Sequence, residues 1–240
     1  MIKPYKNAPI IEAVLEFIVD PVPEIKADQL EKIQSALSEQ YPLKSNIQAA
    51  SVSIQLSNES SVVNTQQAKQ GIRLESADKK RVLQIYHNRF AYSLMAPYTE
   101  WSLFRDEAKK LWNIYKKYVK PKMIVRVGLR NINRIDAEDG TKLEKYFKLY
   151  PNVPDDVKEP IANFLLKLQI PSAAGMAVIH QAAAPHKDGK ISIILDIDLS
   201  NEKKISVSRN DAWTLLEKMR TRKDQLFETF ITPDTRKRFN

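Results

Sequence analysis

Three arginines stand at a spacing suited to binding an anion, within the segment RVGLRNINR at residues 126–134 of this 240-residue chain. Alternate side chains of a β-strand share a face, so Arg126, Arg130 and Arg134 would line one side at intervals of about 13 Å. Gly128 leaves a gap between the first two, where a ligand or another backbone could approach closely. The planar guanidinium group can bind carboxylate or phosphate with two hydrogen bonds. The alternative is structural, because arginines on a strand also pair with acids of neighbouring strands.

Two asparagines fall on the other face of the same segment. Asn131 and Asn133 interrupt an otherwise apolar row, and buried amides need hydrogen-bond partners. The segment therefore supplies five candidate binding residues: Arg126, Arg130, Asn131, Asn133 and Arg134.

A pair of carboxylates in ILDIDL, residues 194–199, is the second candidate. Asp196 and Asp198 would point to the same side of a strand, where they could hold Mg²⁺ for phosphoryl transfer. The same pattern is typical of the wet face of an antiparallel sheet. A metal needs at least one further ligand, and no sequence signature supplies it. We therefore expect no metal at these two residues.

The remaining residue types offer little for catalysis. His87, His180 and His186 are the only histidines, and none has a second histidine three or four residues away, as metal ligands often do. The chain has no Cys and no GxSxG segment. Its five glycines are too far apart for a nucleotide-binding loop. We expect no catalytic residue, no metal and no cofactor, and an enzyme is the less favoured reading.

Positive charge is concentrated in one part of the sequence. The net charge is +9, and residues 101–135 carry 10 basic and 2 acidic side chains, whereas residues 1–100 carry 11 of each. A clustered field steers an anionic partner, either a nucleic acid or an acidic protein. The alternative is a lysine-rich helix face that is exposed to water and binds no partner, which would produce the same excess of basic side chains.

Periodicity in the first half predicts mainly strands. They fall at residues 11–19, 50–56, 71–75, 82–87, 89–95 and 123–135, with a hairpin at His87–Asn88, a polar loop at 57–70 and an acidic turn at 136–140. Helices are expected at 26–40 and from a Thr99 cap to residue 119. The second helix should bury a stripe of seven residues: Trp101, Phe104, Ala108, Leu111, Trp112, Tyr115 and Val119.

The second half partly repeats this layout. We expect a short helix at 143–149, a helix at 156–168, strands at 176–184 and 190–199 joined by a turn at 186–189, and a long helix at 211–230. Trp213 stands near the start of that last helix, as Trp101 does in the first half. The strand connections are too short for crossover helices, which predicts antiparallel pairing.

These elements predict an α+β fold with mainly antiparallel sheet and two long amphipathic, Trp-led helices packed on it. The expected halves are residues 1–136 and 137–240, each α+β, joined as one compact unit, and a diverged internal duplication is one reading of their likeness. No apolar run reaches the 18 residues of a membrane span. No cleavage site of a secretory signal follows the N-terminal apolar stretch. A cytoplasmic protein with no membrane partner is the expectation.

Four segments resemble a sporadically distributed family of uncharacterised bacterial and archaeal proteins of about this length. They are NAPIIEAVLEF at 7–17, VGLRNINRI at 127–135, ILDIDL at 194–199 and LFETFIT at 226–232. The patchy occurrence of that family implies horizontally transferred cargo, such as defence islands or toxin–antitoxin neighbourhoods. The resemblance implies no activity, cofactor or catalytic residue. Asn131 stands where an aromatic residue is common in the family.

The leading hypothesis is a non-enzymatic binding or interaction module with a protein partner. One interpretation makes this module a component of a mobile defence or toxin–antitoxin system. The second is a nucleic-acid-binding protein that uses the basic 101–135 surface, although its aromatic residues fall on the buried stripe rather than among the basic ones. The third is a metal-dependent phosphoryl-transfer enzyme centred on Asp196 and Asp198.

Overall fold

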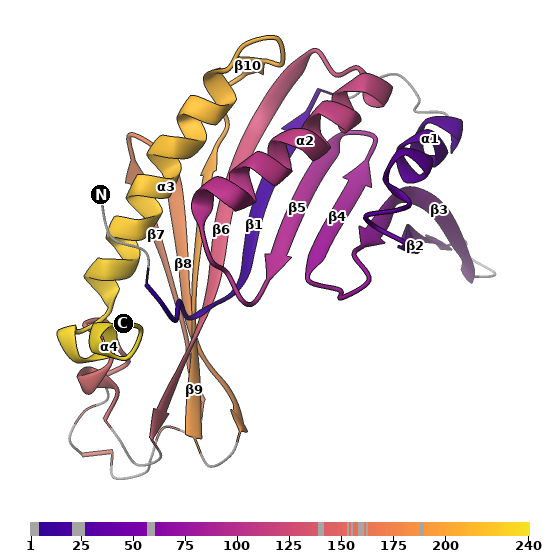
Figure 1. The fold of residues 1–240 in the computed structure, drawn as a ribbon. Coiled ribbons are helices and arrows are strands. Elements are labelled where there is room, and N and C mark those ends of the chain that lie inside the picture. The colour runs from indigo at the N-terminus through magenta and orange to yellow at the C-terminus, as the bar shows by residue number, and fades with distance from the viewer. Residues whose placement is uncertain are drawn as a thin grey trace.

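One antiparallel sheet of ten strands, with helices packed on one face, dominates the computed structural model (Figure 1). The structure describes residues 5–20, 27–56, 61–138, 142–152, 154, 156–157, 161, 163–187 and 190–240. The strands are β1 (Ile10–Val19), β2 (Leu43–Leu56), β3 (Ser61–Glu75), β4 (Arg81–Tyr86), β5 (Arg89–Met95), β6 (Met123–Glu138), β7 (Leu165–Ser172), β8 (Gly175–Lys187), β9 (Lys190–Asn201) and β10 (Ile205–Ser206).

The strand order is β2-β3-β4-β5-β1-β6-β9-β8-β7, and β10 pairs with the start of β6. Every pairing is antiparallel. The predicted α+β fold with a mainly antiparallel sheet is therefore confirmed. β6 pairs with β1 on one side and with β9 on the other, so strands from the first and second halves of the chain form one continuous sheet.

The order of elements repeats across the β1–β6 pair. After β1 the chain passes through α1 (Ala27–Leu37) to one edge of the sheet, returns strand by strand to β5 beside β1, and enters α2 (Trp101–Val119). After β6 it passes through the short η1 (Leu143–Lys145) to the other edge, returns to β9 beside β6, and enters α3 (Asp211–Phe230). This repeat in the order of elements starts at β6, and the expected division into halves at residue 136 stays a prediction.

The core lies between the sheet and the helices. The seven residues predicted for the buried stripe of α2 are all buried, and so is Trp213 of α3. Phe17 of β1 lies edge-on to Trp112 at 4.8 Å and to Trp213 at 5.4 Å between ring centroids. One aromatic cluster therefore joins the central strand to both long helices. No helix within the described residues is long and apolar enough to cross a membrane.

Two predicted elements are wrong. The expected helix at 156–168 is contradicted by β7, whose eight residues start at Leu165, and the described residues before it are not helical. Its apolar residues satisfy helical spacing, but β8 offers a strand edge, and pairing with that edge satisfies the backbone along its whole length. The polar loop expected at 57–70 is strand β3 from Ser61 onward, paired along β2. Residues 57–60 lie outside the described part.

Smaller errors concern element ends. Glu100, not Thr99, is the N-cap of α2, and no side chain caps it by a hydrogen bond. β6 continues through Asp136 to Glu138, where a turn was expected, because β9 pairs with it to the end. β8 likewise runs through His186 to Lys187. The helix expected at 143–149 is the three-residue η1, while β10 and α4 (Pro233–Lys237) were not foreseen.

Candidate binding site

The five predicted binding residues divide between the two faces of β6. Asn131 and Asn133 are 7% and 2% exposed and lie on the face covered by helices. The alternating positions Arg126, Arg130 and Arg134 are half-buried on the opposite side, called here the far face. Sequence periodicity predicted this division, and its consequence is that the five residues cannot form one site.

Each arginine of the far face already holds a carboxylate. Arg130 binds Asp196 of β9 through two parallel hydrogen bonds, from Nε at 2.8 Å and from Nη2 at 2.7 Å. Arg126 pairs with Glu16 of β1, which also binds Arg89 of β5. These contacts form the ladder of ion pairs between neighbouring strands that was the structural alternative to anion binding.

The third arginine belongs to a smaller group at the end of the same row. Arg134 donates to Asp136 Oδ1 at 3.0 Å and to Ser192 Oγ at 2.6 Å. A role of the three arginines in binding a partner stays a prediction.

The gap expected at Gly128 is filled from within the protein. A Cβ at this position would lie 3.3 Å from Arg126 Nη1 and 3.3 Å from the Cβ of Glu16. The glycine therefore gives room to the Arg126–Glu16 pair, which crosses over it. This close approach explains the residue type without an external ligand.

The carboxylate pair of ILDIDL is tied into the same far-face network. Asp196 is buried against Arg130, and His180 Nδ1 of β8 lies 3.5 Å from Asp196 Oδ2. Burial raises the pKa of Asp198, which Arg126 and Arg130 partly oppose. Within the described residues no group of three His, Asp or Glu side chains is arranged to hold a metal ion. That no metal binds at these two residues stays a prediction.

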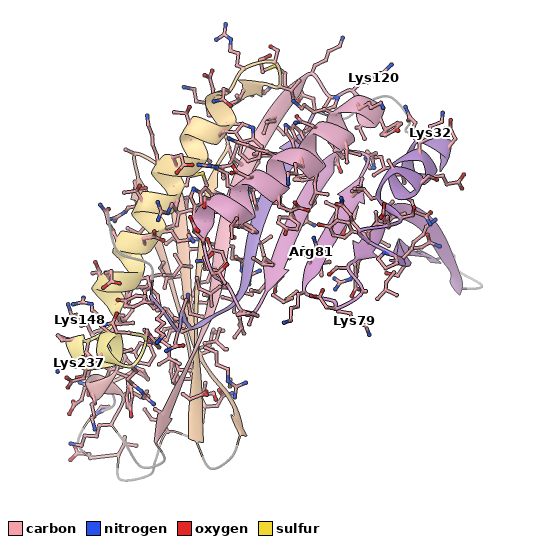
Figure 2. All side chains as sticks on the ribbon, viewed as in Figure 1. Lys32, Lys79, Arg81, Lys120, Lys148 and Lys237 are labelled. Carbon is pink, nitrogen blue, oxygen red and sulfur yellow. The ribbon has the colours of Figure 1, made fainter. Side chains whose placement is uncertain are left out.

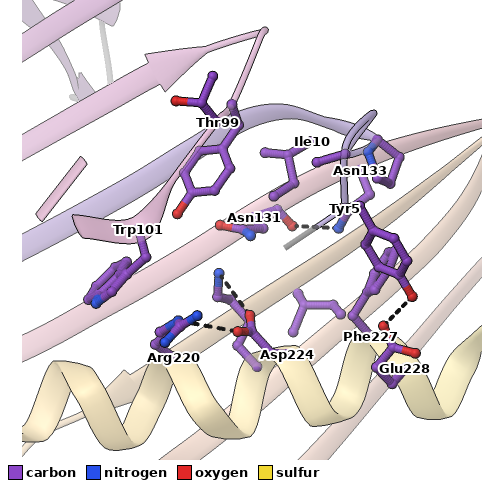
Figure 3. Close-up of a pocket in the computed structure, with 15 residues that line it drawn as sticks. Tyr5, Ile10, Thr99, Trp101, Asn131, Asn133, Arg220, Asp224, Phe227 and Glu228 are labelled. Atoms are coloured by element: carbon purple, nitrogen blue, oxygen red, sulfur yellow. Dashed lines mark hydrogen bonds and ion pairs between the residues drawn. The ribbon is translucent and has the colours of Figure 1, made fainter. Parts of the chain in front are cut away.

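A pocket lies on the helix side of the sheet, under the N-terminal segment (Figure 3). Its volume is about 90 Å³, and its walls come from residues 5–10, the start of α2, β6, β9 and the second half of α3. The lining is largely apolar and includes the side chains of Ile10, Trp101, Ile197 and Phe227. Exposed Thr99 also lines it, so the pocket reaches the protein surface. An apolar lining with a few polar groups is typical of ligand sites, and this pocket is smaller than the roughly 300–1,000 Å³ that drug-sized ligands occupy.

The two asparagines of β6 contribute the polar part of the sheet wall. Asn133 Nδ2 donates to the backbone oxygen of Leu195 at 2.9 Å and, at 3.4 Å, to that of Asn131. These bonds fix the Asn133 amide. The Asn131 side chain makes no hydrogen bond with another described residue, although it is nearly buried. Its amide therefore remains available to a molecule in the pocket.

Lys223 supplies a buried cation to the helix wall. The residue is 3% exposed, and no hydrogen bond joins its Nζ to another described residue. The nearest carboxylate oxygen is Asp224 Oδ1 at 3.9 Å, whereas Asp224 Oδ2 lies 3.3 Å from Arg220 Nε (Figure 3). Burial lowers the pKa of the Lys223 ammonium to about 8, and burial raises the pKa of Asp224.

Lys223 was not identified from the sequence as a candidate site residue, although its position within an apolar stripe of α3 is unusual for a lysine. Residues 216, 219, 223, 226 and 230 recur at helical spacing along the apolar side of α3, and all but one are apolar. A lysine within such a stripe either extends its charge to solvent or is buried with it. The sequence alone cannot separate these cases, because the outcome depends on what covers that face. Here residues 5–10 and the start of α2 border the pocket on that side.

The basic segment 101–135 does not form one surface. Arg126, Arg130 and Arg134 lie on the far face. Arg105, Lys109 and Lys116 belong to α2 on the helix side, where the two lysines line a groove of about 280 Å³ with Arg209. Other basic side chains are widely spread: Figure 2 shows Lys120 at one end of the molecule and Lys148 and Lys237 at the other. The charge excess is therefore divided by the sheet.

Comparison of the chain with protein-family models and with curated proteins found no match.

Proposed function

We propose that this chain is a non-enzymatic binding module and that the pocket beneath residues 5–10 receives part of a protein partner. The observation that carries the proposal is the buried Lys223 ammonium in a largely apolar pocket: it makes no hydrogen bond with a described residue, and it shares its counter-ion Asp224, 3.9 Å away, with Arg220. A buried cation without a hydrogen-bonded counter-ion costs stability, and a ligand that supplies the missing partner removes that cost. The polar groups around it are amides and ion pairs, which hold and orient a ligand.

Partner capture with a blocked pocket tests this function. Ala8 lines the pocket, so Ala8→Phe should fill part of it, while Ala36→Phe places the same side chain on the exposed surface of α1. We expect a protein partner to be retained by the wild type and by Ala36→Phe, and lost by Ala8→Phe. A partner retained equally by all three proteins would remove the pocket from the binding site.

The same experiment addresses the biological setting. Resemblance to a family of horizontally transferred cargo supports a role in a defence or toxin–antitoxin system. A partner encoded beside the gene of this protein is then the expected capture. Partners encoded elsewhere, without relation to such systems, would argue against that setting.

A second candidate function is nucleic-acid binding by the groove between α2 and α3. Lys109, Lys116 and Arg209 line this groove beside the N-terminus of α3, where backbone N–H groups also favour an anion. The aromatic side chains of α2 are buried, which favours contact with phosphates over base stacking. Gel shifts of labelled RNA and DNA should weaken steeply with salt and with Lys109→Ala and Lys116→Ala combined. Unchanged shifts in that variant would exclude the groove.

A further inference from the structure

We infer that the pocket binds a carboxylate group carried on a short apolar chain, with Lys223 as its anchor. This inference rests on the proposed function, because it names the ligand chemistry of the same pocket. It follows from three features of the described residues: the charge balance, the free hydrogen-bonding groups and the size of the space.

The charge balance leaves two cations to share one carboxylate. Asp224 is shared by Arg220 and Lys223, and Arg220 is the nearer of the two. The other carboxylate of the wall, Glu228, accepts a hydrogen bond from Tyr5 and pairs with Arg236. Arg220 and Lys223 therefore share one carboxylate, and an added monoanion would give Lys223 a counter-ion of its own.

The free hydrogen-bonding groups match a carboxylate. Lys223 Nζ can donate up to three hydrogen bonds and donates none to the described residues. The Asn131 side chain is also without a described partner and lies on the facing sheet wall (Figure 3). A carboxylate has two acceptor oxygens, one for each of these donors.

The size of the pocket limits what accompanies the charge. About 90 Å³ corresponds to roughly three water volumes, and a cavity that holds benzene is near 150 Å³. A carboxylate group on a chain of two or three further carbons fits this space, with the chain against the apolar side chains of Ile10, Ile197 and Phe227. Any longer ligand must extend past Thr99 to the surface.

Nearby acids disfavour a more highly charged anion. Phosphate carries nearly two charges at neutral pH and would meet Asp224 and Glu228 on the same helix. The other titratable groups that line the pocket, Tyr5 and Tyr98, have pKa values raised mainly by burial, so they stay neutral. A monoanion is therefore the best match.

Two sources could supply this group: a free short-chain acid, or an acidic side chain or C-terminal carboxylate of the partner protein. Calorimetry with butyrate, butyramide and butylamine tests the chemistry, and a short peptide with a free or an amidated C-terminus tests the source. We expect the wild type to bind butyrate and to bind butyramide at least about tenfold more weakly, because butyramide lacks the charge. Tighter binding of the free-terminus peptide than of butyrate would assign the protein source, and the reverse would assign the free acid.

Two variants of α3 localise the effect. Lys223→Met keeps the length of the side chain without its charge, and Lys218→Met makes the same change at an exposed position. We expect Lys223→Met to lose butyrate binding at least about tenfold and Lys218→Met to keep it within about twofold. Equal binding of butyrate and butyramide, or full binding by Lys223→Met, would overturn the inference.

If Lys223→Met does not fold, the affinity of the wild type for butyrate can be measured over a range of pH instead. Butyrate affinity should fall as pH rises through about 8, where the ammonium loses its proton, while butyrate itself stays ionised. The groups that line the pocket with Lys223 are Arg220, Asp224 and Glu228 of α3, with Tyr5 and Tyr98, and burial raises the pKa of both tyrosines. Constant affinity to pH 10 would overturn the inference. Loss of a protein partner with Ala8→Phe tests the proposed function separately, whatever butyrate does.

Discussion

At the scale of single residues, Lys223 should lower the stability of the empty protein. Its pKa falls from 10.5 to about 8 on folding, mainly through burial, and this shift corresponds to about 3 kcal/mol. Lys223→Met should therefore raise the free energy of unfolding at pH 7, by up to that amount, whereas Lys218→Met should leave it nearly unchanged. Denaturant unfolding of both variants measures the difference. A destabilised Lys223→Met would show that the ammonium is satisfied in the folded state.

The difference in the free energy of unfolding between Lys223→Met and the wild type should depend on pH in one direction. Below pH 8 the lysine is charged in both states, so the cost of burying the charge is fully present. Between about 8 and 10.5 the folded state loses the proton first, and the free energy of unfolding of the wild type rises with pH. The advantage of Lys223→Met should shrink across this window and vanish above it. An advantage independent of pH would point to packing instead.

Arg130 gives the second residue-scale prediction, because Asp196 is 7% exposed in its side chain and depends on this arginine. Arg130→Ala should cost about 2 kcal/mol of stability, the penalty for leaving a buried acceptor unsatisfied. Arg130→Lys should recover part of it, since lysine keeps the charge and loses the two-bond geometry.

Measuring melting temperature together with partner affinity separates the two roles of the arginine row. The paired arrangement predicts lower stability and unchanged affinity for Arg130→Ala. Weakened partner binding with an unchanged melting temperature would instead assign the arginines to recognition.

At the scale of elements, each long helix depends on its tryptophan. Trp101 is 7% exposed and its Nε1 donates to both carboxylate oxygens of Glu217, at 2.9 and 3.0 Å, which links α2 to α3. Trp213 is 9% exposed and packs on Phe17.

Trp101→Ala and Trp213→Ala should each lower the free energy of unfolding by about 3–5 kcal/mol, as truncations of core aromatics do. Leu103→Ala on the exposed side of α2 is the matched control, with an expected change below about 0.5 kcal/mol. A melting temperature close to the wild type for either tryptophan variant would contradict its place in the core.

At the scale of the whole molecule, the two topological units should unfold together. β1 and β6 exchange hydrogen bonds from Ile10 to Val19, and the aromatic cluster around Phe17 spans both units. Unfolding in urea should show coincident transitions by far-ultraviolet circular dichroism and by tryptophan fluorescence. Trp213→Ala should move both transitions equally. Two separated transitions would show that the units are independent domains.

Local periodicity was enough to predict much of this fold. The stripe from Trp101 to Val119, the helix bounds at Asp211 and Phe230, and the hairpin at His87–Asn88 were all predicted correctly, because each pattern is set by near neighbours in the chain. The alternation of arginines and asparagines along β6 also follows from the period of a strand, and the structure places them on opposite faces as expected.

Tertiary structure decided what no local pattern contains. β3 and β7 are strands because a neighbouring strand edge pairs with their backbones, whatever their own periodicity favours. The arginine row became a ladder of ion pairs because β1, β5 and β9 bring carboxylates or further arginines beside it. Lys223 became a buried cation because residues 5–10 and β6, more than 80 positions away in the sequence, enclose the pocket that it lines. A residue's solvent and charge environment depends on such distant contacts, and so the candidate site emerged only from the folded chain.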